Sequence, residues 1–309
     1  MVDVVGPTAS GKTEFALELA RRLEGEIISA DMGQLYRRLD AGTAKPEGSW
    51  EGQDGEAGRV YRAGGIATHM VDMLDPAEAT DAGRYAAAAR PLLDAIRRRG
   101  RRPIVAGGTG LYVRALLEGL DPLPPRDAEL RARLERLAAE KGRLFLHAEL
   151  ERRDPESARR IPPGNLQRVV RALEVAELAG LPMSRLHTRS RKRPPAQGDA
   201  LYLGLLFSPE QLLRRIRARA ERMFPKMIEE VARLVPSEYT GMEPGFRLLG
   251  YPEALACLRG GITFEEGLES MARSTAAYAK RQRTWFRRQT QVRWLDPGAD
   301  PGRIAEELS

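Results

Sequence analysis

Cysteine, histidine and long hydrophobic runs are scarce in this chain, and each shortage excludes a class of protein. The 309 residues include one cysteine, Cys257, so no disulfide can form within the chain, and we expect a reducing, cytoplasmic setting. The three histidines, His69, His147 and His187, lie far apart, and none has the spacing of a zinc site. No stretch approaches the roughly 18 apolar residues of a membrane helix, and no signal peptide is recognisable.

What is present is charge and enough apolar residues for a core. Hydrophobic residues make up 42% of the chain, and the length allows one large domain or two smaller ones. Lys and Arg number 50 against 43 Asp and Glu, a formal net charge of +7. A basic surface attracts polyanions such as nucleic acid. An arginine-rich composition without such a partner explains the charge equally well.

The strongest motif stands close to the first residue. Residues 6–13 read Gly-Pro-Thr-Ala-Ser-Gly-Lys-Thr, the glycine, four-residue, glycine, lysine, threonine pattern of a phosphate-binding loop (P-loop). Residues 2–5 before it are predicted to form a strand, and residues 14–23 after it have the apolar spacing of a helix. Backbone N–H groups at the helix start would face a phosphate. In this motif Lys12 reaches a terminal phosphate and the Thr13 hydroxyl binds Mg²⁺.

The rest of the chain alternates strand and helix patterns, then becomes helical. Strands are predicted at 26–30, 103–106 and 201–207, and a helix at 84–100. We therefore expect an α/β fold, a parallel sheet flanked by helices. Proline-rich linkers at 121–125 and 189–195 enclose a segment with helical periodicity, and from Pro209 the chain is predicted to be helical to about Val292. These patterns predict a core domain of residues 1–122 and 199–309 with an inserted all-helical domain at 123–198.

Two turns at the ligand edge of the predicted sheet are candidate sites besides the P-loop. Ligands of such sheets bind beyond the carboxyl ends of the strands. Asp31 follows the second strand and suits a general base or a magnesium ligand, although a capping or turn aspartate is an equally good interpretation. Thr109 lies in a Gly-Gly-Thr-Gly turn after the third strand, which is weak evidence by itself.

Three helical segments carry basic faces suited to phosphates or nucleic acid. Arg215, Arg219 and Arg222 share one face, as do Lys280, Arg283 and Arg287 beside the aromatic residues Trp285 and Phe286. Trp285 and Phe286 are expected in the core. In residues 167–171, Val169 and Val170 are expected to face the core and leave Gln167, Arg168 and Arg171 free to contact bases. For the first and third faces a solvated helix surface is the simpler alternative, and for the second the alternative is a C-terminal helix that packs its aromatic residues in the core.

Taken together, these segments resemble one family, the tRNA dimethylallyltransferases, also called tRNA isopentenyltransferases. The resemblance covers nearly the whole chain, and the most specific segment is Gly-Thr-Ala-Lys-Pro at residues 42–46, which follows Asp-x-x-Gln at residues 31–34. Further matching segments are residues 6–13, 107–112, 116–125, 167–175, 249–253 and 278–287. The resemblance implies transfer of a dimethylallyl group from dimethylallyl diphosphate to N6 of adenosine 37, in tRNAs that read codons beginning with U.

The resemblance also implies roles for individual residues. Catalytic roles fall to Asp31 as the base, Thr109 near the target adenine, and Lys12. The donor diphosphate would contact Gly6, Pro7, Thr8, Ala9, Ser10, Gly11, Lys12, Thr13 and Arg219. The tRNA anticodon stem-loop would contact Asp31, Met32, Gly33, Gln34, Thr109, Arg131, Gln167, Arg168, Val169, Val170 and Arg171. The implied cofactor is Mg²⁺, held by Thr13, and we expect a soluble, cytoplasmic and monomeric enzyme.

Some positions depart from the family pattern, and other functions remain open. Met32 stands where the family usually has Ser, Thr68 and Pro162 where His is frequent, and Ala276 where Arg is common. The main alternative is a P-loop kinase or NTPase with Asp31 holding Mg²⁺ or activating a hydroxyl. A nucleic-acid-binding nucleotide switch and prenyl transfer to free adenine nucleotides are further alternatives. A kinase does not require the segments at 42–46 and 167–171. A switch would require a second aspartate at the end of a hydrophobic strand, and residues 103–110 supply none.

Overall fold

The computed structural model describes residues 1–52, 59–121, 123–190, 200–288 and 292–308, and for 187–190 the backbone only. The chain divides into two compact units, residues 1–117 with 197–309, and residues 118–196. We call them the sheet unit and the helical unit. The predicted linker at 189–195 and the predicted boundary at 198/199 fall largely or wholly outside the described residues.

The sheet unit is built on one eight-stranded sheet in the order β3-β4-β5-β2-β6-β1-β7-β8. Its strands are β1 (Val2–Val5), β2 (Gly25–Ser29), β3 (Gly48–Glu51), β4 (Val60–Ala63), β5 (Ile66–His69), β6 (Arg102–Gly107), β7 (Leu201–Leu205) and β8 (Val292–Leu295). The strands from β5 to β8 pair in parallel, and only β3, β4 and β5 pair antiparallel. The loops that follow β1, β2 and β6 therefore meet at one edge, which confirms the expected α/β fold.

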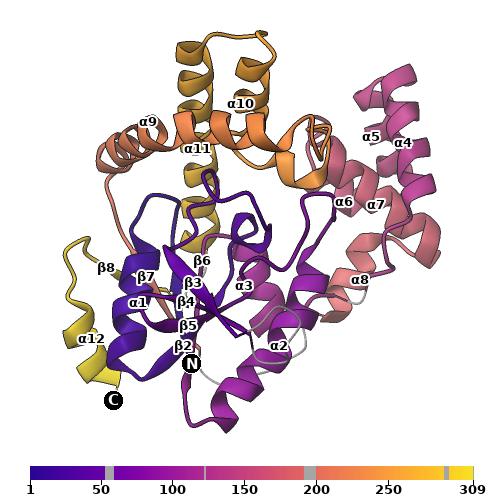
Figure 1. The fold of residues 1–309 in the computed structure, drawn as a ribbon. Helices are drawn as coiled ribbons and strands as arrows, with labels where there is room; N and C mark the ends of the chain where they lie inside the picture. The colour runs from indigo at the N-terminus through magenta and orange to yellow at the C-terminus, as the bar shows by residue number, and fades with distance from the viewer. Residues whose placement is uncertain (53–58, 122, 191–199, 289–291, 309) are drawn as a thin grey trace. The chain divides into compact units, whose positions relative to one another are not determined.

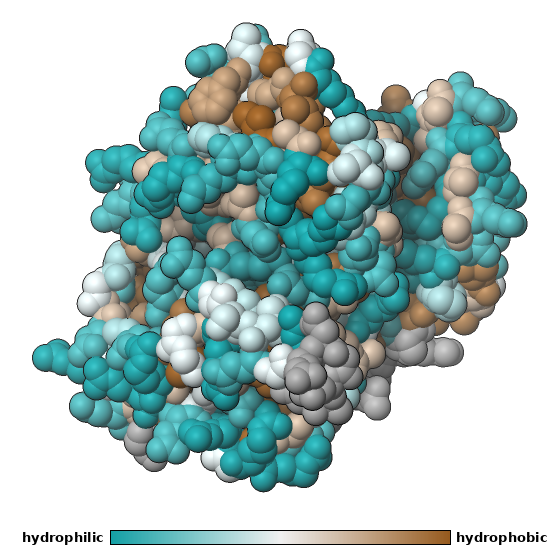
Figure 2. Space-filling view, in the orientation of Figure 1, coloured by the Kyte–Doolittle hydropathy of each residue, from teal (hydrophilic) through white to brown (hydrophobic). Residues whose placement is uncertain are grey.

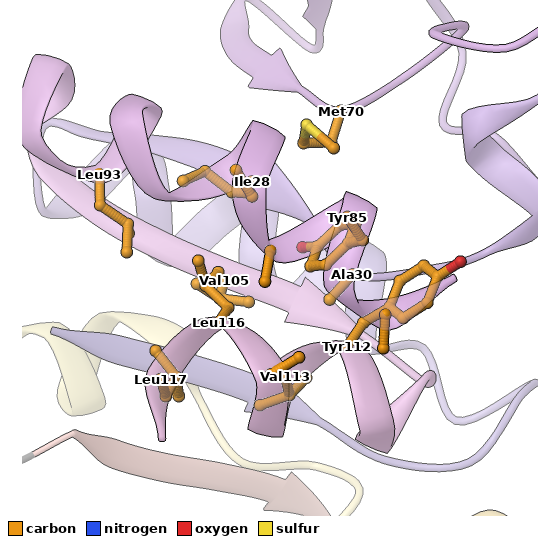
Figure 3. Packing of buried hydrophobic residues seen from close by; sticks show 14 of the residues in the cluster. Ile28, Ala30, Met70, Tyr85, Leu93, Val105, Tyr112, Val113, Leu116 and Leu117 are labelled. Carbon is orange, nitrogen blue, oxygen red and sulfur yellow. The ribbon is translucent and has the colours of Figure 1, made fainter. Parts of the chain in front are cut away.

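Two helical layers cover the sheet. Helices α1 (Lys12–Arg22) and α12 (Pro301–Leu308) pack together on one face, and α2 (Ala82–Arg98) and α3 (Gly110–Leu117) on the other (Figure 1). Alternation along β1 sends Val2 and Val4 to the first layer and Val5 to the second. Figure 3 shows the second layer, where Tyr85 and Tyr112 stack with ring centroids 4.3 Å apart.

A third group of helices belongs to the same unit and contacts the P-loop region. It comprises α9 (Pro209–Leu234), α10 (Tyr251–Leu258) and α11 (Phe264–Arg287), with the short 3₁₀ helix η2 (Pro244–Arg247) between α9 and α10. A second 3₁₀ helix, η1 (Gly33–Leu35), follows β2. Capping boxes at Ser208 and Thr263 satisfy the first N–H groups of α9 and α11 and determine where these long helices begin. Their shared core includes Phe224, Met227, Phe246 and Tyr251.

The helical unit consists of α4 (Ala128–Lys141), α5 (Arg143–Arg153), α6 (Pro155–Arg160), α7 (Leu166–Ala179) and α8 (Met183–Ser190). Its core includes Leu130 and Leu134 from α4 and Val169, Val170 and Leu173 from α7, in agreement with the helical periodicity of this segment. No helix in the described part of the chain is long and apolar enough to cross a bilayer.

The structure differs from the sequence prediction mainly in short strands. The hairpin of β3 and β4 was not expected, and neither was β5, because these strands have only four residues each, and most of β3 is exposed. The prediction of helix from Pro209 to about Val292 is wrong at its end, since Val292 begins β8, which pairs with β7. Residues Tyr202, Leu203 and Gly204 of β7 pair with β8. Local periodicity does not reveal such a long-range pairing.

Candidate active site

The P-loop connects β1 to α1 in a conformation that leaves backbone N–H groups free for a ligand. Gly11 caps α1 with φ of 83°, and no side chain bonds to the first N–H groups of the helix. A helix start without such a cap is an anion site, because its N–H groups and the helix dipole point at the same place. Ser10 adds a buried hydroxyl with no hydrogen-bond partner among the described residues.

Lys12 lies at the start of α1 and is buried, with 8% of its surface exposed. Burial lowers the pKa of Lys12, and the charge of Asp31 opposes this decrease. An ammonium group held in this way is incompletely compensated, so an anion in the pocket would stabilise it. Lys12 and the carboxylate of Asp31 therefore belong to one electrostatic unit, although they come from different loops.

Helix α9 contributes the guanidinium groups, and the predicted shared face is confirmed. Arg215, Arg219 and Arg222 line one pocket of about 1730 Å³ together with Lys12 and Thr13. Arg215 donates from Nε to the carbonyl of Ala9 at 2.7 Å, and Arg219 approaches the Thr8 hydroxyl with Nη1 at 3.4 Å. Burial lowers the pKa of Arg219, while Asp31 raises it, so this arginine also responds to the charge of Asp31.

Asp31 and Thr109 come together from the loops after β2 and β6. The Thr109 hydroxyl accepts a hydrogen bond from the N–H of Met32 at 3.1 Å, and the Thr109 N–H donates to the carbonyl of Ala30 at 3.0 Å. Asp31 Oδ1 accepts from the N–H of Gly33 at 3.0 Å. Asp31 is therefore a turn aspartate, one of its two predicted interpretations, and among the described residues its second oxygen accepts no hydrogen bond that would prevent a role as proton acceptor.

Gln34, the last residue of the Asp-x-x-Gln segment, is buried, and both ends of its amide group form hydrogen bonds. Its Oε1 accepts from the Ser29 hydroxyl at 2.7 Å, and its Nε2 donates to the carbonyl of Ala44 at 3.2 Å. The side chain thereby connects the Asp31 turn to the segment at residues 42–46. Met32 is exposed, whereas Gly33 is buried. Of the four residues predicted to contact tRNA here, Met32 offers the most accessible side chain.

Two residues of α11 join this site, and the sequence analysis gave neither a role there. Gln282 is buried; its Oε1 accepts from the N–H of Thr8 at 2.8 Å, and its Nε2 donates to the carbonyl of Gly108 at 2.8 Å. Tyr278 lies one turn earlier, and burial with the charge of Asp31 raises its pKa to about 12. Only the resemblance, which includes residues 278–287, signalled them. Trp285 and Phe286 pack in the core as expected.

The helical unit arranges its predicted tRNA residues in two groups. Gln167 and Arg168 are exposed on α7. Arg131 and Arg171 both pair with the buried carboxylate of Glu174, at 3.3 and 2.7 Å, and Arg171 also donates to the carbonyl of Pro124. The expectation that Arg171 is free is therefore wrong. The side chains of Val169 and Val170 are buried, so they offer no surface to a ligand in this conformation.

The residues present fit a magnesium ion bound with a phosphate, and not a metal held by protein groups alone. In the described part of the chain, no group of three or more His, Cys, Asp or Glu residues could hold a metal. Mg²⁺ usually keeps several waters and takes its other ligands from substrate phosphates and one or two protein oxygens. Thr13 lines the pocket beside Lys12 and supplies such an oxygen.

Fold and site together define a class: an α/β protein whose P-loop, converging cations and open pocket suit a phosphorylated ligand. Residues 34–289 match the model of the IPP transferase family. The tRNA dimethylallyltransferase of Anaeromyxobacter dehalogenans is 44% identical over 300 residues, which are 97% of this chain and 94% of that protein. That of Elusimicrobium minutum is 40% identical over 96% of this chain and 94% of that protein. The chain belongs to the IPP transferase family.

Solved structures agree with this assignment. The full-length tRNA isopentenylpyrophosphate transferase of Bacillus halodurans has a TM-score of 0.66 and 34% identity, covering 99% of this chain and 93% of that one. A eukaryotic dimethylallyltransferase acting on tRNA has a TM-score of 0.75 over 96% of this chain and 73% of that one. At 24% identity this second likeness shows the fold alone.

Proposed function

We propose that this protein is a tRNA dimethylallyltransferase that transfers a dimethylallyl group from dimethylallyl diphosphate to N6 of adenosine 37 of tRNA. The observation that carries the proposal is the convergence of Asp31 with Lys12 and Arg219, because it places a proton acceptor beside a cationic cradle. A kinase could use the same groups, with Asp31 activating a hydroxyl, and membership of the IPP transferase family favours prenyl transfer over that alternative. We further propose that the substrates are tRNAs reading codons that begin with U, and that the protein acts as a monomer.

The donor side of the site stabilises a leaving group. The P-loop N–H groups, Lys12 and Arg219 would hold the diphosphate, whose negative charge grows as the allylic C–O bond breaks. The Thr13 hydroxyl would hold Mg²⁺, which adds charge stabilisation on the diphosphate oxygens. These groups are preorganised around an anion site, so little reorganisation accompanies bond breaking. The electron pair of the C–O bond leaves with the diphosphate.

The acceptor side prepares the nucleophile. The adenine amine is a weak nucleophile because its lone pair is delocalised into the ring. As N6 bonds to the allylic carbon, its proton would pass to Asp31, which a hydrogen bond from Gly33 orients. The adenine must first leave its stack, which costs roughly a few kcal/mol and is easiest in a single-stranded loop.

Labelled dimethylallyl diphosphate tests the proposal directly. The protein is incubated with the donor, Mg²⁺ and unmodified tRNA containing an adenosine at position 37, and we expect label in tRNA with release of diphosphate. A parallel reaction with ATP measures phosphate release. Hydrolysis of ATP without label in tRNA would overturn the proposal in favour of the kinase or NTPase alternative.

Asp31→Asn separates catalysis from binding. The amide keeps an oxygen to accept from Gly33 but cannot take the proton, so the transfer rate should fall roughly 10²- to 10⁴-fold. tRNA affinity should change by less than about threefold. The matched control is Asp94→Asn, an exposed carboxyl on α2 that pairs with Arg97, and it should transfer normally. Equal loss of binding and transfer in Asp31→Asn would make Asp31 structural.

A further inference from the structure

Gln282 lies beyond the ends of β1 and β6, where strand pairing no longer connects the loops that follow these two strands. The ladder between β1 and β6 ends at the pair Val5 and Gly107. Beyond it, no backbone hydrogen bond among the described residues joins the P-loop to the turn that carries Thr109. Gln282 accepts a hydrogen bond from the P-loop and donates one to the loop that carries Thr109, both at 2.8 Å. Its amide therefore connects the two loops beyond the end of the β1–β6 ladder.

The site is built around this amide. Gln282 is 5% exposed, and a β-carbon added at Gly108 would lie 2.2 Å from Gln282 Nε2. Gly108 therefore permits the close approach that the bond to its own carbonyl requires. A primary amide offers a donor and an acceptor on one planar group. A carboxylate of the same size would set an oxygen against the Gly108 carbonyl, and a thioether would leave both backbone groups unpaired.

We propose that Gln282 is a positioning residue that fixes the separation between the diphosphate-binding loop and the Asp31–Thr109 side of the site. The inference rests on the proposed function, since it concerns the alignment of donor and acceptor. Gln282 holds the N–H of Thr8, so this N–H is not one of the groups that bind the diphosphate. Tyr278, one turn away on α11, lies close enough to Asp31 for the charge of that carboxylate to raise the pKa of its hydroxyl.

Misalignment lowers the rate more than the affinity, because each loop still binds its own ligand. A displacement of about 1 Å between reacting groups can cost as much as 10²-fold in rate. We expect Gln282→Met and Gln282→Glu to lower kcat roughly 10- to 100-fold, with Glu the more severe. The KM for dimethylallyl diphosphate and the affinity for inorganic diphosphate should change by less than about threefold. Arg273→Met is the control, because Arg273 is an exposed α11 residue that forms an ion pair with Glu269.

Hydrogen exchange provides a readout that does not depend on activity. The Thr8 N–H should exchange faster in Gln282→Met than in the native protein, while amides within α11 keep their protection. Faster exchange with lowered kcat and native KM supports the proposal. Unchanged Thr8 exchange would overturn it, and so would a loss of rate that merely follows loss of folded protein in thermal unfolding. Failure of the native protein to modify tRNA would count against the proposed function and not against the contact.

Discussion

At the scale of single residues, the least expected side chain is the carboxyl of Asp3 in the central strand β1. It is fully buried, and neither of its oxygens has a hydrogen-bond partner among the described residues. It lies on the same side of the strand as Val5, facing the layer of α2 and α3. Burial raises the pKa of Asp3 to about 8. The carboxyl is therefore protonated in the folded protein at neutral pH.

This shift predicts that stability falls as pH rises. The folded pKa of about 8 lies above the ordinary value of 3.8, so between these values the folded state holds a proton that the unfolded state has lost. The free energy of unfolding should decrease from about pH 5 to pH 8. Asp3→Val should flatten this slope and add about 1–3 kcal/mol at pH 7, measured by urea denaturation with tryptophan fluorescence.

Below pH 4 the carboxyl is protonated in both states, and the advantage of Asp3→Val should shrink. Asp81→Asn is unsuitable as a control because Asp81 caps α2. Asp94→Asn, at an exposed position, is suitable and should keep the native slope. An identical slope in Asp3→Val and the native protein would show that Asp3 does not titrate in this way.

At the scale of elements, one buried carboxylate holds the segment that follows Gln34. Glu230 on α9 accepts from the N–H groups of Asp40 and Ala41 at 2.8 and 3.2 Å and from the Tyr251 hydroxyl at 2.6 Å. The Tyr251 hydroxyl accepts in turn from the N–H of Gly42 at 3.2 Å. A loop whose backbone is bonded this closely is part of the rigid scaffold of the site, although the sequence pattern marks it only as a motif.

Removing this anchor should destabilise the fold and weaken transfer. Glu230→Ala leaves two N–H groups and the hydroxyl proton of Tyr251 without an acceptor, and we expect a loss of about 2–4 kcal/mol in the free energy of unfolding. Glu230→Gln keeps an acceptor and should lose less. Glu229→Ala, the exposed neighbour on the same helix, should change stability by less than about 0.5 kcal/mol. Equal losses for the two alanine variants would contradict the role of Glu230.

At the scale of the whole molecule, the net charge of +7 suits a polyanionic substrate. Hydrophilic residues dominate the face in Figure 2, and one of its apolar areas lies over the ends of α10 and α11, where Leu258 and Phe264 are exposed. Within the helical unit, Arg168 is exposed, whereas Arg131 and Arg171 are held by Glu174. These arginines should therefore respond differently to substitution.

The salt dependence of tRNA affinity should distinguish the exposed Arg168 from the arginines that pair with Glu174. We expect tRNA affinity to fall at least roughly tenfold between 50 and 200 mM salt, because phosphate contacts release counterions. Arg168→Gln should reduce the slope of log affinity against log salt by about one, with native stability. Arg131→Gln should instead lower stability, since it strips a partner from a buried carboxylate. Affinity that does not depend on salt would remove the case for a phosphate-binding surface.

The features of this protein that depend on local pattern could be predicted from the order of its residues. The P-loop between a strand and a helix, the parallel strands with covering helices, the basic face of α9 and the apolar stripes of α4 and α7 follow from spacing along the chain. The turn at Asp31 was recognisable as a candidate site because strand ends meet at one edge of a parallel sheet.

The hydrogen-bond and ion-pair partners of the polar groups are visible only in the folded structure. Gln282 forms hydrogen bonds with two loops that lie more than 170 positions away in the chain. Glu174 pairs with two arginines that were expected to contact tRNA. Strand β8 joins the sheet by pairing with β7. The physical reason is the same in each case. A buried amide or carboxylate and the edge of a sheet must satisfy their hydrogen bonds with whatever the fold brings near, and spacing along the chain does not contain that information.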